Sequence, residues 1–229
     1  KAKFPRYVKT NDPTGHAGIY FGPIEDKHAA QKLVHTIENL FDLCRDYAAL
    51  QQSPAGPCAW KQMGKCVGPC DGTIDLAAYR ELIAHSAAAL GDPRREVEEH
   101  SRRMREAAAE LRFEAAEKIK AYIHQFAALE KGAWRHMRPL TKFNYLSLQR
   151  VPRAGTAKAF LITPGRIEEL FGCIREPDGL SDLLRQAMTI AHDRRMDEID
   201  AIGAERIGVV AHHLFQPKAK QGVFISLEA

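Results

Sequence analysis

Four cysteines lie within a short stretch of this chain, at Cys44, Cys58, Cys66 and Cys70, in the pattern C-x13-C-x7-C-x3-C. Cysteine thiolates are soft ligands that bind zinc ions or iron–sulfur clusters. Structural zinc sites usually contain two pairs of cysteines that are about two to four residues apart. Only Cys66 and Cys70 are spaced in that way. The four cysteines therefore predict a metal centre, and their spacing favours an iron–sulfur cluster over a zinc ribbon. Both kinds of centre remain open at this point.

The segment that carries these cysteines is rich in proline and glycine. Residues 54–72 read PAGPCAWKQMGKCVGPCDG, a composition that excludes a long helix or a central strand. Ordering such a loop costs about 1–2 kcal/mol per residue, and bonds to one ion or cluster would supply that free energy. Unlinked core cysteines would leave the clustering unexplained. Disulfides are disfavoured because the chain shows no secretory signal.

Helices are expected on both sides of this loop. Apolar residues recur every three or four positions from His28 to Leu43, with Asp26 as the N-cap, so this helix delivers Cys44 at its C-terminal end. A second helix is expected from about Asp75 to Leu90, capped by Thr73 and ended by Gly91.

A pair of helices should follow. Asp92-Pro93 is typical of a helix start, and the pattern breaks near Arg112 before a second arm that runs from Phe113 to about Lys131. The two arms predict an antiparallel hairpin, with Phe113 and Tyr122 among the apolar residues on its inner side.

The last part of the chain predicts a small α+β domain. Strands are expected over residues 143–151, 157–162, 166–174 and 222–227, with a helix over 180–199 and a shorter one over 204–215. The predicted fold class is therefore mixed and mainly α, with a C-terminal α+β domain that contains a small mixed sheet. We expect a Cys-rich metal-cluster module at 1–91, a helical hairpin at 92–131 and a basic α+β domain at 132–229.

Basic residues are concentrated in one segment. The chain has a net charge of +4, yet residues 131–158 contain seven Lys or Arg and no Asp or Glu. Such segregation suggests binding to a polyanion such as DNA, the alternative being a solvated basic surface. Aromatic residues are interleaved with these basic residues, at Trp134, Phe143 and Tyr145, and one such ring would stack on an unpaired base. For Trp134 the favoured alternative is packing between the hairpin and the last domain. The candidate DNA-binding residues are Lys131, Trp134, Arg135, Arg138, Lys142, Arg150, Arg153 and Lys158.

Several of these motifs together resemble the UvrC family, the incision subunit of bacterial nucleotide excision repair. The resemblance rests on Cys44 followed by PCAWKQMGKCVGPC, on Phe4-Pro5-Arg6 and on Tyr20-Phe21-Gly22-Pro23, and with the hairpin it covers roughly residues 1–130. It implies that Cys44, Cys58, Cys66 and Cys70 hold one 4Fe-4S cluster, with zinc as the alternative.

The hairpin is similar to the UVR motif, through which UvrB and UvrC pair. The resemblance implies a UvrB-like helicase subunit as partner, alongside DNA, and partner contacts at Met104, Leu111, Phe113, Glu114 and Ile119. Lys120-Ala121 stands where the family usually has Arg-Asp, which removes directional charge contacts. A generic helical hairpin would show similar spacing.

No catalytic residue is predicted. Gly18-Ile19-Tyr20 spells half of the GIY-YIG nuclease signature, but no Tyr-x-Gly follows; the family's nuclease domain would lie upstream. The final strands carry only Glu168 and Glu169, too few carboxylates for a second metal-dependent nuclease.

We therefore expect a cytoplasmic, non-catalytic, DNA- and partner-binding portion of a UvrC-like DNA repair endonuclease. The alternatives are a zinc-binding UVR-type regulatory protein and an enzyme that acts through its last 90 residues.

Overall fold

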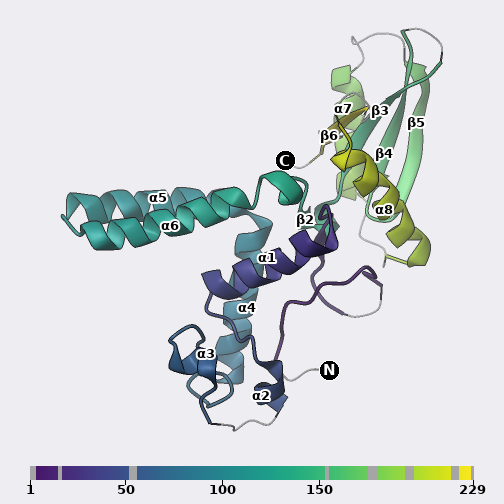
Figure 1. The fold of residues 1–229 in the computed structure, drawn as a ribbon. Helices are drawn as coiled ribbons and strands as arrows, with labels where there is room; N and C mark the ends of the chain where they lie inside the picture. Colours follow the sequence, from purple (N-terminus) through teal and green to yellow (C-terminus); the bar gives the residue numbers. More distant parts are fainter. Residues whose placement is uncertain are drawn as a thin grey trace. The chain divides into compact units, whose positions relative to one another are not determined.

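The structure, a computed structural model, describes residues 4–14, 17–51, 56–152, 155–174, 180–193, 199–217 and 222–227. Its elements separate into two units (Figure 1). Unit 1 comprises Lys1–Lys9 and Asp26–Arg135, and unit 2 comprises Thr10–Glu25 and His136–Ala229. The expected mixture of helices and strands is confirmed, but the predicted mixed sheet is wrong, because every strand pair in the described residues is antiparallel. The division at residues 91 and 131 stays a prediction.

Helix α1 (Lys27–Leu40) positions the first cysteine. Asp26 caps it as predicted, because its Oδ1 accepts hydrogen bonds from the backbone N–H groups of His28 (2.7 Å) and Ala29 (2.8 Å). The helix ends three residues earlier than predicted, where Asp42 adopts a left-handed conformation with φ of 47°. Cys44 therefore lies beyond the helix, in a segment without regular secondary structure.

The cysteine loop contains two short helices, α2 (Tyr47–Gln51) and α3 (Ala59–Gln62), and is followed by α4 (Leu76–Gly91). The prediction that Thr73 caps α4 is wrong. The cap is Asp75, whose Oδ1 accepts from the N–H of Ala78 at 2.8 Å, while Thr73 donates from its backbone and its hydroxyl to Asp71. A carboxylate directly before the first helical residue is the better-placed acceptor.

Helices α5 (Pro93–Ala109) and α6 (Phe113–Ala128) form the predicted antiparallel hairpin and lie side by side in Figure 1. The turn between them is tight, since the N–H of Arg112 bonds to the carbonyl of Ala107 (2.8 Å) and that of Leu111 to Ala108 (3.0 Å). Helix ends with this pair of hydrogen bonds usually have glycine at the position of Leu111, because the residue there is left-handed. Leu111 has a φ of 59°. Phe113, predicted on the inner side, is 64% exposed.

Unit 2 contains the two sheets. The short strands β1 (Phe21–Gly22) and β2 (Arg138–Pro139) pair antiparallel, as do all neighbours in the four-stranded sheet of order β5-β4-β3-β6. Its strands are β3 (Tyr145–Arg150), β4 (Ala157–Thr163), β5 (Arg166–Ile174) and β6 (Val223–Ser226). The helices are α7 (Leu180–Asp193) and α8 (Ala201–Phe215). Residues 194–198, the end of the predicted first helix, lie outside the described ranges.

Alternation along the strands builds a core on each face of this sheet. Successive strand residues point to opposite faces, so Tyr145 and Ile162 pack with α8, through residues such as Val210. Leu146 and Leu161 pack with α7 on the other face. Helix α8 begins three residues earlier than predicted because Asp200 caps it, accepting from the N–H of Gly203 at 2.6 Å.

Candidate functional site

All four predicted cysteine ligands lie in one apolar core of unit 1. Cys44, Cys66 and Cys70 are buried, and the partly buried Cys58 packs against them. None of the four forms a disulfide. Residues from the chain start, the loop and α4 complete this core, among them Phe4, Leu50 and Tyr79. The structure therefore gathers the four thiols that the sequence predicted to act together.

Backbone hydrogen bonds fix the loop around these thiols. The N–H of Cys44 donates to the hydroxyl of Tyr79 on α4 (3.2 Å), and the N–H of Val67 donates to the carbonyl of Asp42 (3.0 Å). The N–H of Gly68 points to the sulfur of Cys66 at 3.5 Å. Gly68 has φ of 79°, a conformation that favours glycine.

The thiols interact in two pairs, Cys44 with Cys66 and Cys58 with Cys70. The hydrogen bond with Cys44 lowers the pKa of Cys66 to about 6, with help from the N–H of Gly68 and the positive charges of Lys61 and Arg45. The same bond and burial raise the pKa of Cys44, and burial raises that of Cys70. Cys66 is thus the sulfur that the site most readily keeps as a thiolate.

The geometry of a single-ion metal site is not formed by these cysteines. Across the described ranges, which include all four of them, no group of three or more His, Cys, Asp or Glu side chains is arranged closely enough to hold one metal ion. The donor set nevertheless has the chemistry of an iron–sulfur site, because it offers four free thiols in one core, an N–H directed at a sulfur and two nearby cations.

Sequence reasoning missed three residues of this site: Tyr79, Arg45 and Lys61. The two cations sit one residue after Cys44 and three residues after Cys58, so their nearness to the cysteines along the chain was a usable signal. The sequence around Tyr79 contained no such signal, because the role of Tyr79 depends on the packing of α4 against the loop.

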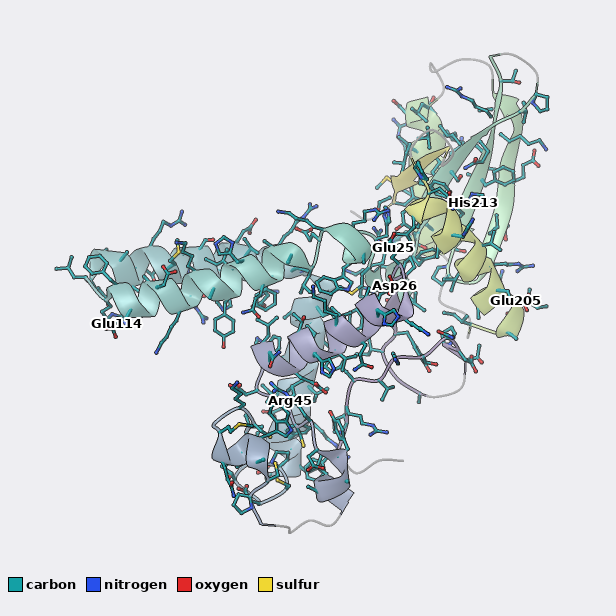
Figure 2. The ribbon with its side chains drawn as sticks, viewed as in Figure 1. Glu25, Asp26, Arg45, Glu114, Glu205 and His213 are labelled. Atoms are coloured by element: carbon teal, nitrogen blue, oxygen red, sulfur yellow. The ribbon has the colours of Figure 1, made fainter. Side chains whose placement is uncertain are left out.

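The hairpin presents two apolar side chains at its tip. Leu111 is 72% and Phe113 64% exposed, and Glu114 is exposed beside them (Figure 2). Met104 and Ile119, the other predicted partner contacts, are half-buried. The predicted contacts therefore divide into an exposed tip and positions partly used by the hairpin itself.

The basic residues are divided between the units. Lys131 and Arg135 are exposed in unit 1, and Lys142 and Arg150 are exposed in unit 2. In unit 2, the guanidinium of Arg138 lies over the ring of Tyr145 and donates to the hydroxyl of Ser226 (2.8 Å). The ammonium of Lys158 pairs with Glu169 at 3.0 Å. Arg153 lies outside the described residues.

The interleaved aromatic residues are not placed to stack on bases. Trp134 is only 8% exposed and its Nε1–H donates to the carbonyl of Ala29 at 3.1 Å. Phe143 and Tyr145 are buried in the core of unit 2. A buried ring has no face open to a base, so Trp134 is a packing residue and the prediction of aromatic stacking is wrong.

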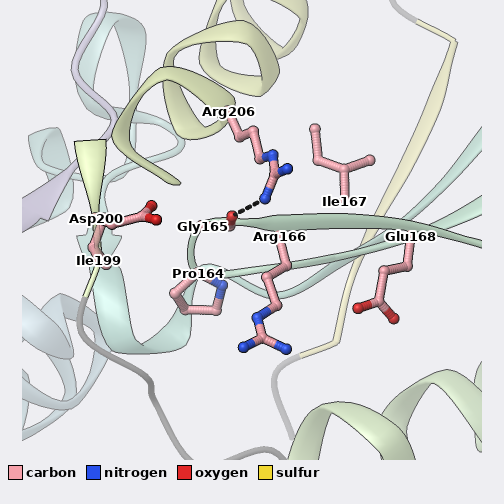
Figure 3. Close-up of a pocket in the computed structure, with 8 residues that line it drawn as sticks. All are labelled: Pro164, Gly165, Arg166, Ile167, Glu168, Ile199, Asp200 and Arg206. Atoms are coloured by element: carbon pink, nitrogen blue, oxygen red, sulfur yellow. Dashed lines mark hydrogen bonds between the residues drawn. The ribbon is translucent and has the colours of Figure 1, made fainter. Parts of the chain in front are cut away.

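Unit 2 also contains a pocket of about 520 Å³ at the β4–β5 turn. Figure 3 shows Arg206 reaching the carbonyl oxygen of Gly165, with which it forms a hydrogen bond of 3.1 Å. Arg166 and Glu168 extend from the other side of β5, and Asp200 completes the charged lining. Two basic and two acidic side chains do not select a ligand of one charge.

Within the described part of the chain, no helix is both long and apolar enough to cross a membrane.

In unit 1 the cysteine-rich core is followed along the chain by the helical hairpin. Residues 1–89, which include all four cysteines, match the family model described as "UvrC/Cho excinuclease, middle domain". This match defines the class that the segment resembles, the middle domain of an excision nuclease.

Individual proteins similar to the chain include UvrABC system protein C from several bacteria. The chain is 29% identical to that of Alkalilimnicola ehrlichii over 129 residues (56% of this chain, 21% of that protein) and 32% identical to that of Desulforudis audaxviator over 121 residues (52% and 19%). It is 27% identical to a Thermus thermophilus protein of that name over 166 residues (72% and 28%). These matches confirm the resemblance to the UvrC family. The chain spans less than a third of each of these relatives, and no solved structure matches it.

Proposed function

We propose that this chain is the DNA- and partner-binding portion of a UvrC-like endonuclease of nucleotide excision repair, held together by a 4Fe-4S cluster at Cys44, Cys58, Cys66 and Cys70. The observation that carries the proposal is the gathering of these four free thiols in one core, inside the segment similar to the excinuclease middle domain.

The residues present are chemically suited to a cluster. A 4Fe-4S cluster is held by four cysteine thiolates, each on its own iron, so its ligands do not have to converge on one point as they do around a single ion. The cluster would act as a structural staple between the segment after α1 and helix α4. The chain's own residues position the sulfurs, through the bonds from Cys44 to Tyr79 and from Gly68 to Cys66.

The hairpin would bind the partner through its tip. Leu111 and Phe113 are apolar side chains held out into solvent by the turn between α5 and α6, and apolar side chains of this kind supply binding free energy when a partner buries them. We propose a UvrB-like helicase subunit as that partner, with Glu114 contributing a charge at the edge of the contact. Met104 and Ile119 would support the helices from within the hairpin.

DNA would bind through the exposed basic side chains. Lys131, Arg135, Lys142 and Arg150 are exposed cations, and each can neutralise a phosphate. Arg135, Arg138 and Lys158 have polar partners to exchange first. Phosphate contacts of this kind give affinity without sequence selectivity.

The test measures binding of this chain to a purified UvrB-like subunit and cutting of labelled DNA. The double variant Leu111→Ala, Phe113→Ala should bind the partner at least about tenfold more weakly than the wild-type chain. The control is Ile202→Ala, Val209→Ala, which removes two comparably exposed side chains (57% and 56%) from α8. Equal losses in both variants would contradict the tip contact. Metal-dependent cutting by the chain alone would contradict the non-catalytic role.

A further inference from the structure

Arg45 directly follows the first cysteine and is held from three directions. Its Nη2 donates to the carbonyl oxygen of Glu38 (3.4 Å) and to Oδ1 of Asn39 (2.5 Å), both on α1. Its guanidinium carbon lies 4.4 Å from the centre of the Trp60 ring on α3. Figure 2 labels Arg45 in the cysteine-rich part of the chain. The protein thus fixes this guanidinium between the two helices that flank Cys44 and Cys58.

One donor of this guanidinium has no acceptor. Nε of Arg45 is buried and has no hydrogen-bond partner among the described residues. Arginine carries five N–H donors in a fixed planar arrangement, so the bonds made by Nη2 do not satisfy Nε. A buried donor without an acceptor costs free energy, which indicates that the site is completed by a group that the polypeptide does not supply.

The charges around the cysteines indicate the sign of the charge that this completing group would carry. The positive charges of Arg45 and Lys61 both act on the sulfur of Cys66. The ammonium of Lys61 lies 3.5 Å from the carbonyl oxygen of Val67, on the same loop. Opposing charge comes from carboxylates such as Asp71, which acts on Cys70, and the buried Glu38 next to His35. A negatively charged group in this core would be stabilised by the two cations.

We propose that Arg45 is a positioning residue of the cysteine site, whose Nε–H and positive charge act directly on the iron–sulfur cluster and its thiolates. The inference rests on the proposed cluster and goes beyond its four ligands. Hydrogen bonds to the sulfurs and charges near a cluster alter its reduction potential and its stability. Lysine would not replace Arg45, because it lacks the planar face that lies against Trp60 and the Nε–H within that plane.

The experiment compares Arg45→Gln and Arg45→Lys with the wild-type chain after anaerobic purification. Three quantities are measured: iron per chain, the midpoint reduction potential, and the rate of iron loss to an excess of chelator. The matched control is Arg94→Gln, which removes a guanidinium that is 79% exposed and pairs with Glu130 in the same unit. Circular dichroism checks that each variant keeps its helices.

We expect Arg45→Gln to lose iron about tenfold faster than the wild type, since hydrogen bonds to charged groups are among the stronger ones. A tenfold weaker stabilisation of the reduced cluster moves its potential by about 59 mV to more negative values. The rate of iron loss and the potential of Arg45→Lys should lie between those of the wild type and Arg45→Gln, because lysine keeps the positive charge but not the guanidinium. Arg94→Gln should match the wild type.

The outcomes separate the two proposals. Wild-type chain that folds without iron would overturn the cluster and this inference together. A full iron load in Arg45→Gln with unchanged potential and rate of iron loss would overturn the inference and leave the cluster standing. If Arg45→Gln is folded but takes up no iron, recovery of iron in Arg45→Lys supports the role of the charge, and no recovery supports the need for the guanidinium.

Discussion

The backbone N–H of Cys44 donates a hydrogen bond of 3.2 Å to the hydroxyl oxygen of Tyr79, which lies 35 residues later on α4. Tyr79 is completely buried, and burial raises its pKa to about 12, so the hydroxyl stays protonated near neutral pH. This bond joins the first cysteine to the helix that follows the loop. It holds the two ends of the cysteine-rich segment together independently of any metal.

Replacing Tyr79 by Phe should therefore destabilise unit 1. The ring still fills the core, but the buried N–H of Cys44 loses its acceptor, which costs about 1–3 kcal/mol in the free energy of unfolding. Urea unfolding followed by tryptophan fluorescence measures this, because Trp60 and Trp134, the two tryptophans of the chain, both lie in unit 1. The control is Tyr122→Phe, at a ring that is 36% exposed. Identical unfolding midpoints for both variants would show that the bond contributes nothing.

Gly68 should resist substitution more strongly than Gly64. Both have positive φ (79° and 68°), but a Cβ at Gly68 would lie 2.7 Å from Oδ1 of Asp71, while a Cβ at Gly64 meets no atom within 4 Å. Asp71 is held by its bonds from Thr73, so it cannot simply move away. Gly68→Ala should thus lower the free energy of unfolding by roughly 1–3 kcal/mol more than Gly64→Ala. Equal losses in the same urea experiment would mean that the loop has room at Gly68.

Much of this fold follows from the sequence because its determinants are local. Asp26 and Asp92 cap their helices as predicted, since an acceptor before a helix needs only its own neighbours. The strands predicted over 157–162 and 166–174 also appear within one residue of those bounds, as β4 and β5. The sequence analysis chose Thr73 as the cap of α4, whereas the structure uses Asp75, which directly precedes the first helical residue.

The parts that the sequence did not predict depend on contacts between distant residues. Packing was the favoured interpretation of Trp134, but its partner, the carbonyl of Ala29, 105 residues away, was not predicted. Arg45 has no motif of its own, and its role appears only when Trp60 lies beside it. The four cysteines could be predicted as one group because their spacing and their surrounding glycines and prolines are visible along the chain.

Leu111→Gly should stabilise the hairpin while weakening its partner contact. Leu111 has φ of 59° and is 72% exposed, so glycine removes backbone strain of about 1 kcal/mol and little packing. Leu111→Ala keeps the strain and removes the same side chain, which makes it the control. We expect a higher thermal midpoint for the glycine variant alone and weaker partner binding for both. A lower midpoint for glycine than for alanine would contradict this reading of the turn.

DNA binding should depend on salt in proportion to the phosphate contacts. Lys142→Gln and Arg150→Gln, at two exposed positions of unit 2, should each reduce the slope of log affinity against log salt by about 0.9 on duplex DNA. Lys118→Gln, at an exposed position on α6, should leave the slope unchanged. Titration by fluorescence anisotropy at several salt concentrations measures the three slopes. Equal slopes in all variants would remove both residues from the interface.

The most direct test of the account is the iron and acid-labile sulfide content of the chain purified without oxygen. We predict about four irons and four sulfides per chain, with broad absorbance at about 400 nm. Cys66→Ser should lose the iron together with much of the folded protein, and Cys173→Ser, at the fifth cysteine, should keep it. A colourless, fully folded chain that contains one zinc ion and no iron would contradict the cluster.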